Sequence, residues 1–515
     1  KPCEDFHDYV CSVAESRFKL RDDRSLHTFA FSYSRERILE AKKNFFKNLK
    51  KEKNLSPRAH QFQDFYKSCM NTKVRAQEER ERLKTLQKEL AKIKNAKEFV
   101  QFLNEQALKG QYTFVRFGNS PDFDDPLKLD SLLFLNLMSL PDHSYYEKAD
   151  VMAAYKDLLV KFFKTIEPQI KPAKAAARAE QQLQLQKDFI KTYPVASVRR
   201  QRWSERRVST QKQTSEKYPV LNLSYVLDKT PADTIVTIPI PEAFDFLNTH
   251  LTEENLNIFK DLYLYKTAGD FLDESAPAYY QKRFDFNKKF FGGPAVRPVL
   301  QERFTETASR FFNMEIDQVL VDRLFPNFQD KKIHAIADAI RASIAAGLER
   351  NTWLSSDARK EAIKKIKTAR LQLVRPQTDR EWDFLDIQKY SPVKYLANMD
   401  VHGRASLAKN FEELKHPANQ EAWGMSPLTV NAYYSPNENK FVLPIGILQY
   451  PFYDEKGDLT ANLGAVGAVM GHELGHSIDD QGSQYDADGK LHQWMTPKDR
   501  TEFNKRGHKM IDQFN

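Results

Sequence analysis

Two histidines four residues apart, with a glutamate directly after the first, lie in the segment GAVMGHELGHSIDDQG: His472, Glu473 and His476. On a helix, residues four apart share one face, so both imidazoles can bind the same ion. Imidazole nitrogens bind zinc at about 2.0–2.1 Å. Glu473 would lie beside the ion, where a carboxylate can take a proton from water and pass it to a leaving amine. The pattern predicts a hydrolytic zinc site.

The residues around this motif predict a helix with two different faces. Within residues 460–479, apolar side chains recur at helical spacing away from the motif: Val466, Met470, Leu474 and Ile478. One face is therefore expected to pack and the other to carry chemistry. The alternative is a buried helix with two hydrogen-bonded histidines, in which the glycines at 464, 467, 471 and 475 are close-packing positions.

A hydrolytic zinc also needs a third protein ligand. A third histidine six residues beyond His476 is excluded, because that position is Gly482. Glu502 is the only later glutamate, and no motif of ligand type surrounds it. Asp479 and its neighbour lie at the end of the same helix, where they are badly placed to reach the ion. We expect two zinc ligands from this chain.

Length and composition indicate a large folded protein. The chain has 515 residues, and since single cores stop growing near about 250–300 residues, two lobes are expected. Hydrophobic residues make up 41%, which excludes disorder, and no apolar run approaches the roughly 18 residues of a membrane helix. The net charge is +9, but the basic stretches at 42–53 and 199–207 alternate with other residues as on solvated helix faces. No nucleic-acid partner is expected.

Helical periodicity dominates the chain. Between Ile333 and Leu348, isoleucine and leucine side chains recur at steps of three and four residues, as on one face of a helix. Two short segments, Thr234 to Ile240 and Lys440 to Leu448, have strand character. The second contains a proline, which suits an edge strand. Asp486 to Gly489 resembles the start of a calcium loop, but later ligand positions are lost, so a hairpin turn is expected.

The cysteines raise a separate question of pairing. If the stretch from Cys3 to Cys11 is helical, about 12 Å separates the two, which is more than the roughly 4.4–6.8 Å that a disulfide spans. They are not expected to pair with each other. Two buried free thiols are the alternative.

Several longer motifs add a resemblance. NAYYSPNENKFVLPIGILQYPFYD (431–454), GHELGHSIDDQGSQYDADGKLHQWMT (471–496) and KPCEDFHDYVC resemble segments of the neprilysin and endothelin-converting-enzyme family of zinc metallopeptidases. The resemblance implies a mainly α protein with a small β-sheet and two lobes. A thermolysin-like catalytic lobe, residues 1–30 and 335–515, and a helical cap lobe, residues 31–334, would enclose a central cavity.

The resemblance also implies roles for single residues. His472 and His476 match the zinc ligands, Glu473 matches the catalytic base, and Asn431 and Ala432 match residues that hold the substrate backbone. The third ligand of the family is a glutamate further along, on polypeptide that this chain does not contain. Cysteines near the family's C-terminus pair with those that match Cys3 and Cys11. We therefore expect a separate C-terminal segment, disulfide-linked through Cys3 or Cys11.

The sequence thus predicts a zinc-dependent endopeptidase or oligopeptidase that hydrolyses peptides through a metal-activated water, with Glu473 as general base. An extracytoplasmic location is expected: secreted, periplasmic or in the ectodomain of a membrane-anchored protein. The alternative function is a peptide-binding pseudo-enzyme of the same fold without a competent metal site.

Overall fold

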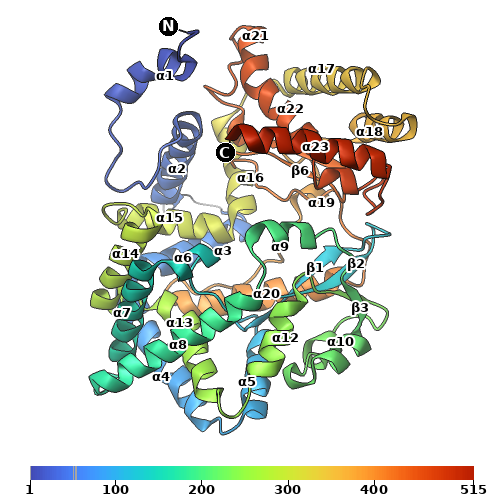
Figure 1. The fold of residues 1–515 in the computed structure, drawn as a ribbon. Helices are drawn as coiled ribbons and strands as arrows, with labels where there is room; N and C mark the ends of the chain where they lie inside the picture. The colour runs from blue at the N-terminus through green and yellow to red at the C-terminus, as the bar shows by residue number, and fades with distance from the viewer. Residues whose placement is uncertain (1, 50–51, 53–54, 515) are drawn as a thin grey trace.

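A computed structural model describes residues 2–49, 52 and 55–514, and most of this part of the chain is helical (Figure 1). The buried apolar side chains form two separate clusters. The first core draws on residues between Leu86 and Phe286. The second core combines Ile38 to Cys69 with Phe304 to Met495. The predicted fold class, mainly helical with little sheet and two lobes, is confirmed.

The helices divide between the two cores in long runs of sequence. Those around the first core are α4 (Thr72–Lys92), α5 (Ala96–Leu108), α6 (His143–Glu147), α7 (Ala149–Ile166), α8 (Pro172–Thr192), α9 (Ala196–Arg202), α10 (Gln211–Lys217), α11 (Ser224–Leu227), α12 (Pro241–His250), α13 (Leu256–Phe271) and α14 (Pro277–Phe291). Those around the second core are α2 (Phe29–Leu49), α3 (Pro57–Met70), α15 (Leu300–Phe311), α16 (Asn313–Leu324), α17 (Asp330–Glu349), α18 (Ser356–Thr368), α19 (Asp379–Trp382), α20 (Tyr395–Glu413), α21 (Leu459–Asn462), α22 (Ala468–Gly475) and α23 (Pro497–Phe514).

The second core shows which helices pack together with the predicted metal helix. Ile38 of α2, Phe65 of α3 and Phe304 of α15 belong to the same buried cluster as Met470 of α22. The lobe boundaries predicted from the sequence, at residues 31 and 335, stay a prediction, because shared packing does not measure which parts move together.

Two small sheets complete the fold. The first contains β1 (Val115–Pro121), β2 (Leu129–Leu135), β4 (Ile235–Thr237) and β3 (Val208–Thr210), in that spatial order. The second contains β5 (Arg370–Val374), β7 (Lys440–Pro444) and β6 (Tyr433–Ser435), again in spatial order. In this second sheet β5 and β7 are parallel, whereas β6 and β7 are antiparallel with Tyr434 opposite Phe441. β6 is therefore an edge strand.

The predicted edge strand at Lys440 to Leu448 is wrong in its position and its length. β7 is the central strand, between β5 and β6, and it ends at Pro444. All five of its residues are buried, which is typical of a central strand. Proline is tolerated here because it is the last residue of the strand. The hairpin turn at Asp486 to Gly489 is confirmed, with Tyr485 bridged to Leu491 and Gly489 at φ +82°.

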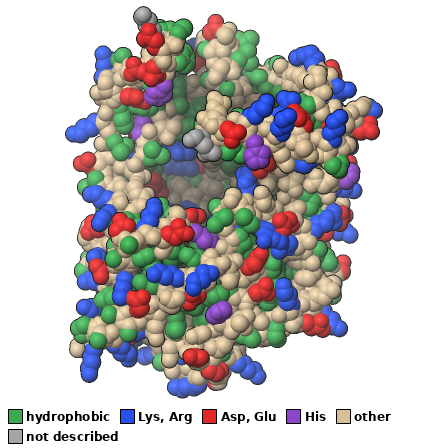
Figure 2. All heavy atoms as spheres, viewed as in Figure 1, with side chains coloured by type: hydrophobic (Ala, Val, Ile, Leu, Met, Phe, Trp, Pro, Cys, Tyr) green, Lys and Arg blue, Asp and Glu red, His purple; other side chains and the backbone are tan. Residues whose placement is uncertain are grey.

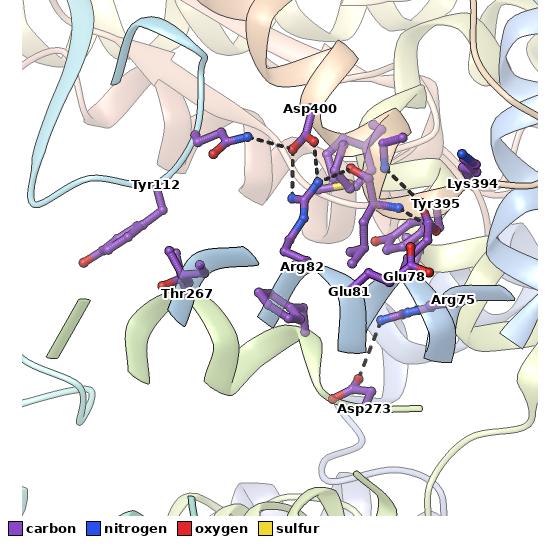
Figure 3. A pocket seen from close by; sticks show the side chains of 18 of the residues that line it. Arg75, Glu78, Glu81, Arg82, Tyr112, Thr267, Asp273, Lys394, Tyr395 and Asp400 are labelled. Atoms are coloured by element: carbon purple, nitrogen blue, oxygen red, sulfur yellow. Dashed lines mark hydrogen bonds and ion pairs between the residues drawn. The ribbon is translucent and has the colours of Figure 1, made fainter. Parts of the chain in front are cut away.

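A cavity of about 1050 Å³ lies between the two cores. Helices α4 and α13 line it from the first core, and α15 and α20 from the second. Polar side chains from both sides meet there, since Arg82 of α4 donates to Asp400 of α20 at 2.9 Å; on the side of the first core, Arg75 approaches Asp273 at 3.9 Å (Figure 3). On the face drawn in Figure 2, the surface is also hollowed where the upper and lower parts of the molecule meet.

The N-terminal helix α1 (Phe6–Arg17) buries none of its residues. Cys3 is exposed and Cys11 is half-buried, so the alternative of two buried thiols is wrong. The expectation that these two cysteines do not pair with each other is confirmed, since both thiols are free. Across the residues that the structure describes, no helix is both long and apolar enough to span a membrane.

Asp499 joins the beginnings of two helices of the second core. Its carboxylate accepts hydrogen bonds from the N–H and hydroxyl of Ser355, at 2.7 and 2.6 Å, and from the N–H and hydroxyl of Thr496, at 2.9 and 2.7 Å. Ser355 is the N-cap of α18, and Asp499 lies in the first turn of α23. Burial alone would raise the pKa of Asp499, but these hydrogen bonds outweigh it and lower the pKa to about 2.

We predict that Asp499→Asn lowers the melting temperature at pH 7, because a carboxylate with a depressed pKa stabilises the fold by about 1–2 kcal/mol above its unfolded pKa. This contribution disappears as the pH falls through the folded value, so the two proteins should converge between about pH 4 and pH 2. Thermal unfolding across this range measures the effect. The control is Asp512→Asn, an exposed position in the same helix. Equal melting temperatures at pH 7 would contradict the assignment.

Candidate metal centre and substrate strand

The predicted metal helix begins at Leu459 and ends at Gly475. Its parts are α21, a single π-helical segment at Leu463–Gly467, and α22. Val466, Met470 and Leu474 are fully buried in the second core, and Ile478 packs against it. The predicted apolar stripe is therefore confirmed, although the helix ends four residues before Asp479. Packing of this stripe fixes the helix and turns the histidines to the other side.

The two histidines converge on one point. His472 is exposed, the His476 side chain is 39% exposed, and their Nε2 atoms lie 3.1 Å apart. Two nitrogens bound to one tetrahedral zinc ion at about 2.0–2.1 Å would be separated by roughly 3.4 Å. The separation fits a shared ion.

The alternative of a buried helix with hydrogen-bonded histidines agrees with the structure in one part: the two Nε2 atoms are within hydrogen-bond distance, but His472 is exposed and His476 only half-buried. Its close-packing role for the glycines also fails at three of the four positions, since Cβ atoms added at 464, 471 and 475 would meet nothing within 4 Å.

Asp479 orients one of the rings. The carboxylate oxygen Oδ2 lies 2.8 Å from Nδ1 of His476, and since a carboxylate can only accept, Nδ1 carries the proton and Nε2 keeps its lone pair. The other oxygen of Asp479 accepts from the N–H groups of Gln481, at 2.9 Å, and Gly482, at 2.7 Å. From the sequence, Asp479 is considered only as a direct ligand, so this role was missed. Its position three residues after His476 was the available signal.

Glu473 is 7% exposed and lies against the small sheet. Burial raises the pKa of Glu473, while the charges of His476 and His472 and a hydrogen bond from the Tyr434 main chain act in the opposite direction. Tyr434 is the middle residue of β6. The carboxylate therefore lies beside the edge of the sheet.

Asn431 and Ala432 directly precede the edge strand β6. Asn431 is exposed, whereas Ala432 is 5% exposed and belongs to the second core. Among the described residues β6 pairs with β7 alone, so its other side carries no further strand. Because the Tyr434 main chain contacts Glu473, the structure brings the predicted substrate residues and the predicted base to one place.

No third ligand joins the histidine pair among residues 2–49, 52 and 55–514. In this part of the chain, one set of three metal-ligating side chains is close enough for a single ion, and it lies elsewhere, on α1: His7, Cys11 and Glu15. Glu502 lies on α23, where it pairs with Arg506 at 2.9 Å. The expectation of two zinc ligands from this chain, His472 and His476, stays a prediction.

The amino-acid sequence is similar to those of several curated proteins. The chain is 29% identical over 292 residues to the endothelin-converting enzyme homolog of Locusta migratoria, covering 54% of this chain and 40% of that protein. It is 36% identical over 182 residues to neprilysin-3 of Drosophila melanogaster, covering 34% and 23% respectively. The chain thus spans less than half the length of these curated relatives.

The fold has a close counterpart among solved structures. The zinc metalloprotease Zmp1 of Mycobacterium tuberculosis, in complex with an inhibitor, matches with a TM-score of 0.89 at 22% identity, over 100% of this chain and 78% of that one. Two sequence profiles, both described as Peptidase family M13, match residues 2–376 and 431–515. Since these profiles cover most of the sequence, the chain belongs to peptidase family M13, and its resemblance to neprilysin and the endothelin-converting enzymes is confirmed.

Proposed function

We propose that this chain carries the catalytic helix and the substrate strand of a zinc-dependent endopeptidase or oligopeptidase. One observation carries the proposal: the Nε2 atoms of His472 and His476 converge at 3.1 Å, with the buried Glu473 next to them and beside a free strand edge. Membership of a peptidase family supports the same reaction.

His472 and His476 would hold the zinc through Nε2, with Asp479 keeping His476 in the required tautomer. Zinc, when bound, supplies Lewis acidity, which polarises a peptide carbonyl and lowers the pKa of water. Glu473 acts as the general base: its carboxylate takes a proton from the attacking water and delivers it to the departing amide nitrogen. Burial, which raises the pKa of Glu473, brings the carboxyl nearer the value at which it can both accept and return a proton.

Peptide binding is assigned to the free edge of β6. An extended peptide can add there as a further strand through main-chain hydrogen bonds, which do not depend on side-chain identity. The exposed Asn431 and the main chain at Ala432 would hold the peptide next to Glu473. None of the residues that line the cavity of about 1050 Å³ belongs to the proposed zinc site or substrate strand, so peptide binding is assigned to β6 and not to that cavity.

The remaining parts of the zinc site and its context are proposed from the sequence alone. The third ligand would be a glutamate on polypeptide that this chain does not contain, and Cys3 or Cys11 would link to that segment by a disulfide. The free thiols of both cysteines do not test this link. An extracytoplasmic location belongs to the same proposal, because disulfides persist in oxidising compartments.

We predict that Glu473→Gln in the complete protein retains zinc but lowers kcat on a quenched fluorescent peptide by about 10²–10⁴-fold, the usual contribution of a general base. Zinc content and turnover are measured on the same preparation. Glu502→Gln is the control, since in the described part of the chain this half-buried glutamate pairs with Arg506 of its own helix. Full activity of Glu473→Gln with zinc retained would remove Glu473 as the base. Wild-type protein that binds peptide without cleaving it would favour the pseudo-enzyme.

Removal of the metal gives an independent prediction. Treatment with a chelator should abolish cleavage, and added zinc should restore it, while His472→Ala should lose zinc and fail to recover. His416→Ala should behave as wild type, because His416 is exposed and contacts Glu412 on α20. Zinc content is measured by elemental analysis, and cleavage is measured with the same peptide assay, for the wild type and both variants. Undiminished cleavage by the metal-free protein would contradict the proposed function.

A further inference from the structure

Lys365 of α18 is completely buried, and it lies under the loop that follows the metal helix. Its Nζ donates to the carbonyl oxygen of Gly482 at 2.6 Å and to that of Tyr485 at 2.5 Å. Within the described part of the chain, no carboxylate lies within 4.0 Å of this ammonium group. Main-chain oxygens of the loop therefore replace water around a buried cation.

The loop held by Lys365 is folded tightly against the end of the metal helix. A Cβ added to Gly482 would lie 1.9 Å from the carbonyl oxygen of His476, so only glycine fits. The Gly482 N–H donates to Asp479 Oδ1 at 2.7 Å, and the Ser483 N–H donates to the Asp479 carbonyl at 3.0 Å. Gly482 thus contacts Lys365 through its C=O and Asp479 through its N–H.

We propose that Lys365 is a positioning residue for the metal centre: by holding Gly482 and Tyr485 it keeps Asp479 against His476, and so aims the Nε2 atom of His476. The path runs from α18 through the loop to the Asp479 carboxylate, which lies 2.8 Å from Nδ1 of His476. The inference rests on the proposed zinc site, to which it adds a residue more than a hundred positions earlier in the chain.

The chemistry of burial supports an anchoring role. Burial lowers the pKa of Lys365 to about 7, against the opposing charges of Asp486, Glu361 and Asp479. Both the amine and the ammonium form can donate to two carbonyls, so the anchor is kept on either side of neutral pH. An apolar side chain of similar length would avoid desolvation of a cation but would take one donor from each of two carbonyls. Tyr485 would keep the indole N–H of Trp494 at 2.9 Å as a partner, and the Gly482 carbonyl would keep the Tyr485 N–H at 3.1 Å.

The test measures zinc affinity of the full chain by competition with a chromophoric chelator, using zinc alone. Loss of an outer partner of a metal ligand commonly costs about 10–100-fold in affinity. We expect this cost for Asp479→Ala and about a tenfold loss for Lys365→Met. Because Lys365 acts through Asp479, the double variant should be no weaker than Asp479→Ala alone.

A control is available in Lys440, another buried lysine, which donates to the carbonyls of Gln420 and Ala422 at 3.1 and 2.9 Å and, unlike Lys365, also pairs with Glu438 at 2.8 Å. Lys440→Met should lower the melting temperature but leave zinc affinity within about twofold, which separates positioning from general loss of stability.

A second measurement does not depend on the metal. In metal-free protein with ¹⁵N-labelled histidine, His476 should be an Nδ1–H tautomer in the wild type and a mixture in Lys365→Met. If Lys365→Met does not fold, Lys365→Gln, which keeps one amide donor, should give an intermediate loss.

Unchanged affinity in a folded Lys365 variant, or losses that add in the double variant, would overturn the proposal. Failure of the complete wild-type protein to bind zinc would instead overturn the proposed function, while the tautomer of His476 would still test the anchor.

Discussion

The geometry of the site depends on two imidazole rings that meet at one point. Each ring turns about two side-chain bonds, so a helix alone brings His472 and His476 near each other without aiming them. Packing of Val466, Met470 and Leu474 fixes the helix, and the carboxylate of Asp479 fixes the His476 ring. The resulting separation of 3.1 Å between Nε2 atoms is achieved in the protein alone, so little rearrangement is required when an ion binds.

The small sheet supplies the second half of the site. β7 is buried between its neighbours, which leaves β6 as an edge strand with one free side. The Tyr434 main chain then ties this strand to Glu473. Under the proposed function, a peptide that extended the sheet would be brought to the residue proposed as the base. Helix α22 and strand β6 belong to the same core and contact each other through Glu473 and Tyr434.

Part of this arrangement could be predicted from the sequence, because it is local. Spacing alone places His472, Glu473 and His476 on one helix face and Val466, Met470 and Leu474 on another. The turn at Asp486 to Gly489 is likewise decided by neighbouring residues. Features that depend on contacts between residues far apart in the sequence were not predicted.

Two of the features that were missed depend on distant contacts, and one depends on where a helix ends. The position of β7 at the centre of its sheet is set by β5, which pairs with it from some seventy residues earlier. Asp479 reaches His476 only because the helix ends at Gly475 and the chain turns back. Lys365 stands in the run KKIK, which resembles a solvated helix face, and its burial comes from a loop 117 residues away.

Anomalous X-ray diffraction at the zinc edge, from crystals of the chain grown with zinc, tests the central claim most directly. The account predicts an anomalous peak within about 2.0–2.1 Å of Nε2 of both His472 and His476. A zinc peak only elsewhere, such as at His7, Cys11 and Glu15 on α1, with none at the histidine pair, would contradict it.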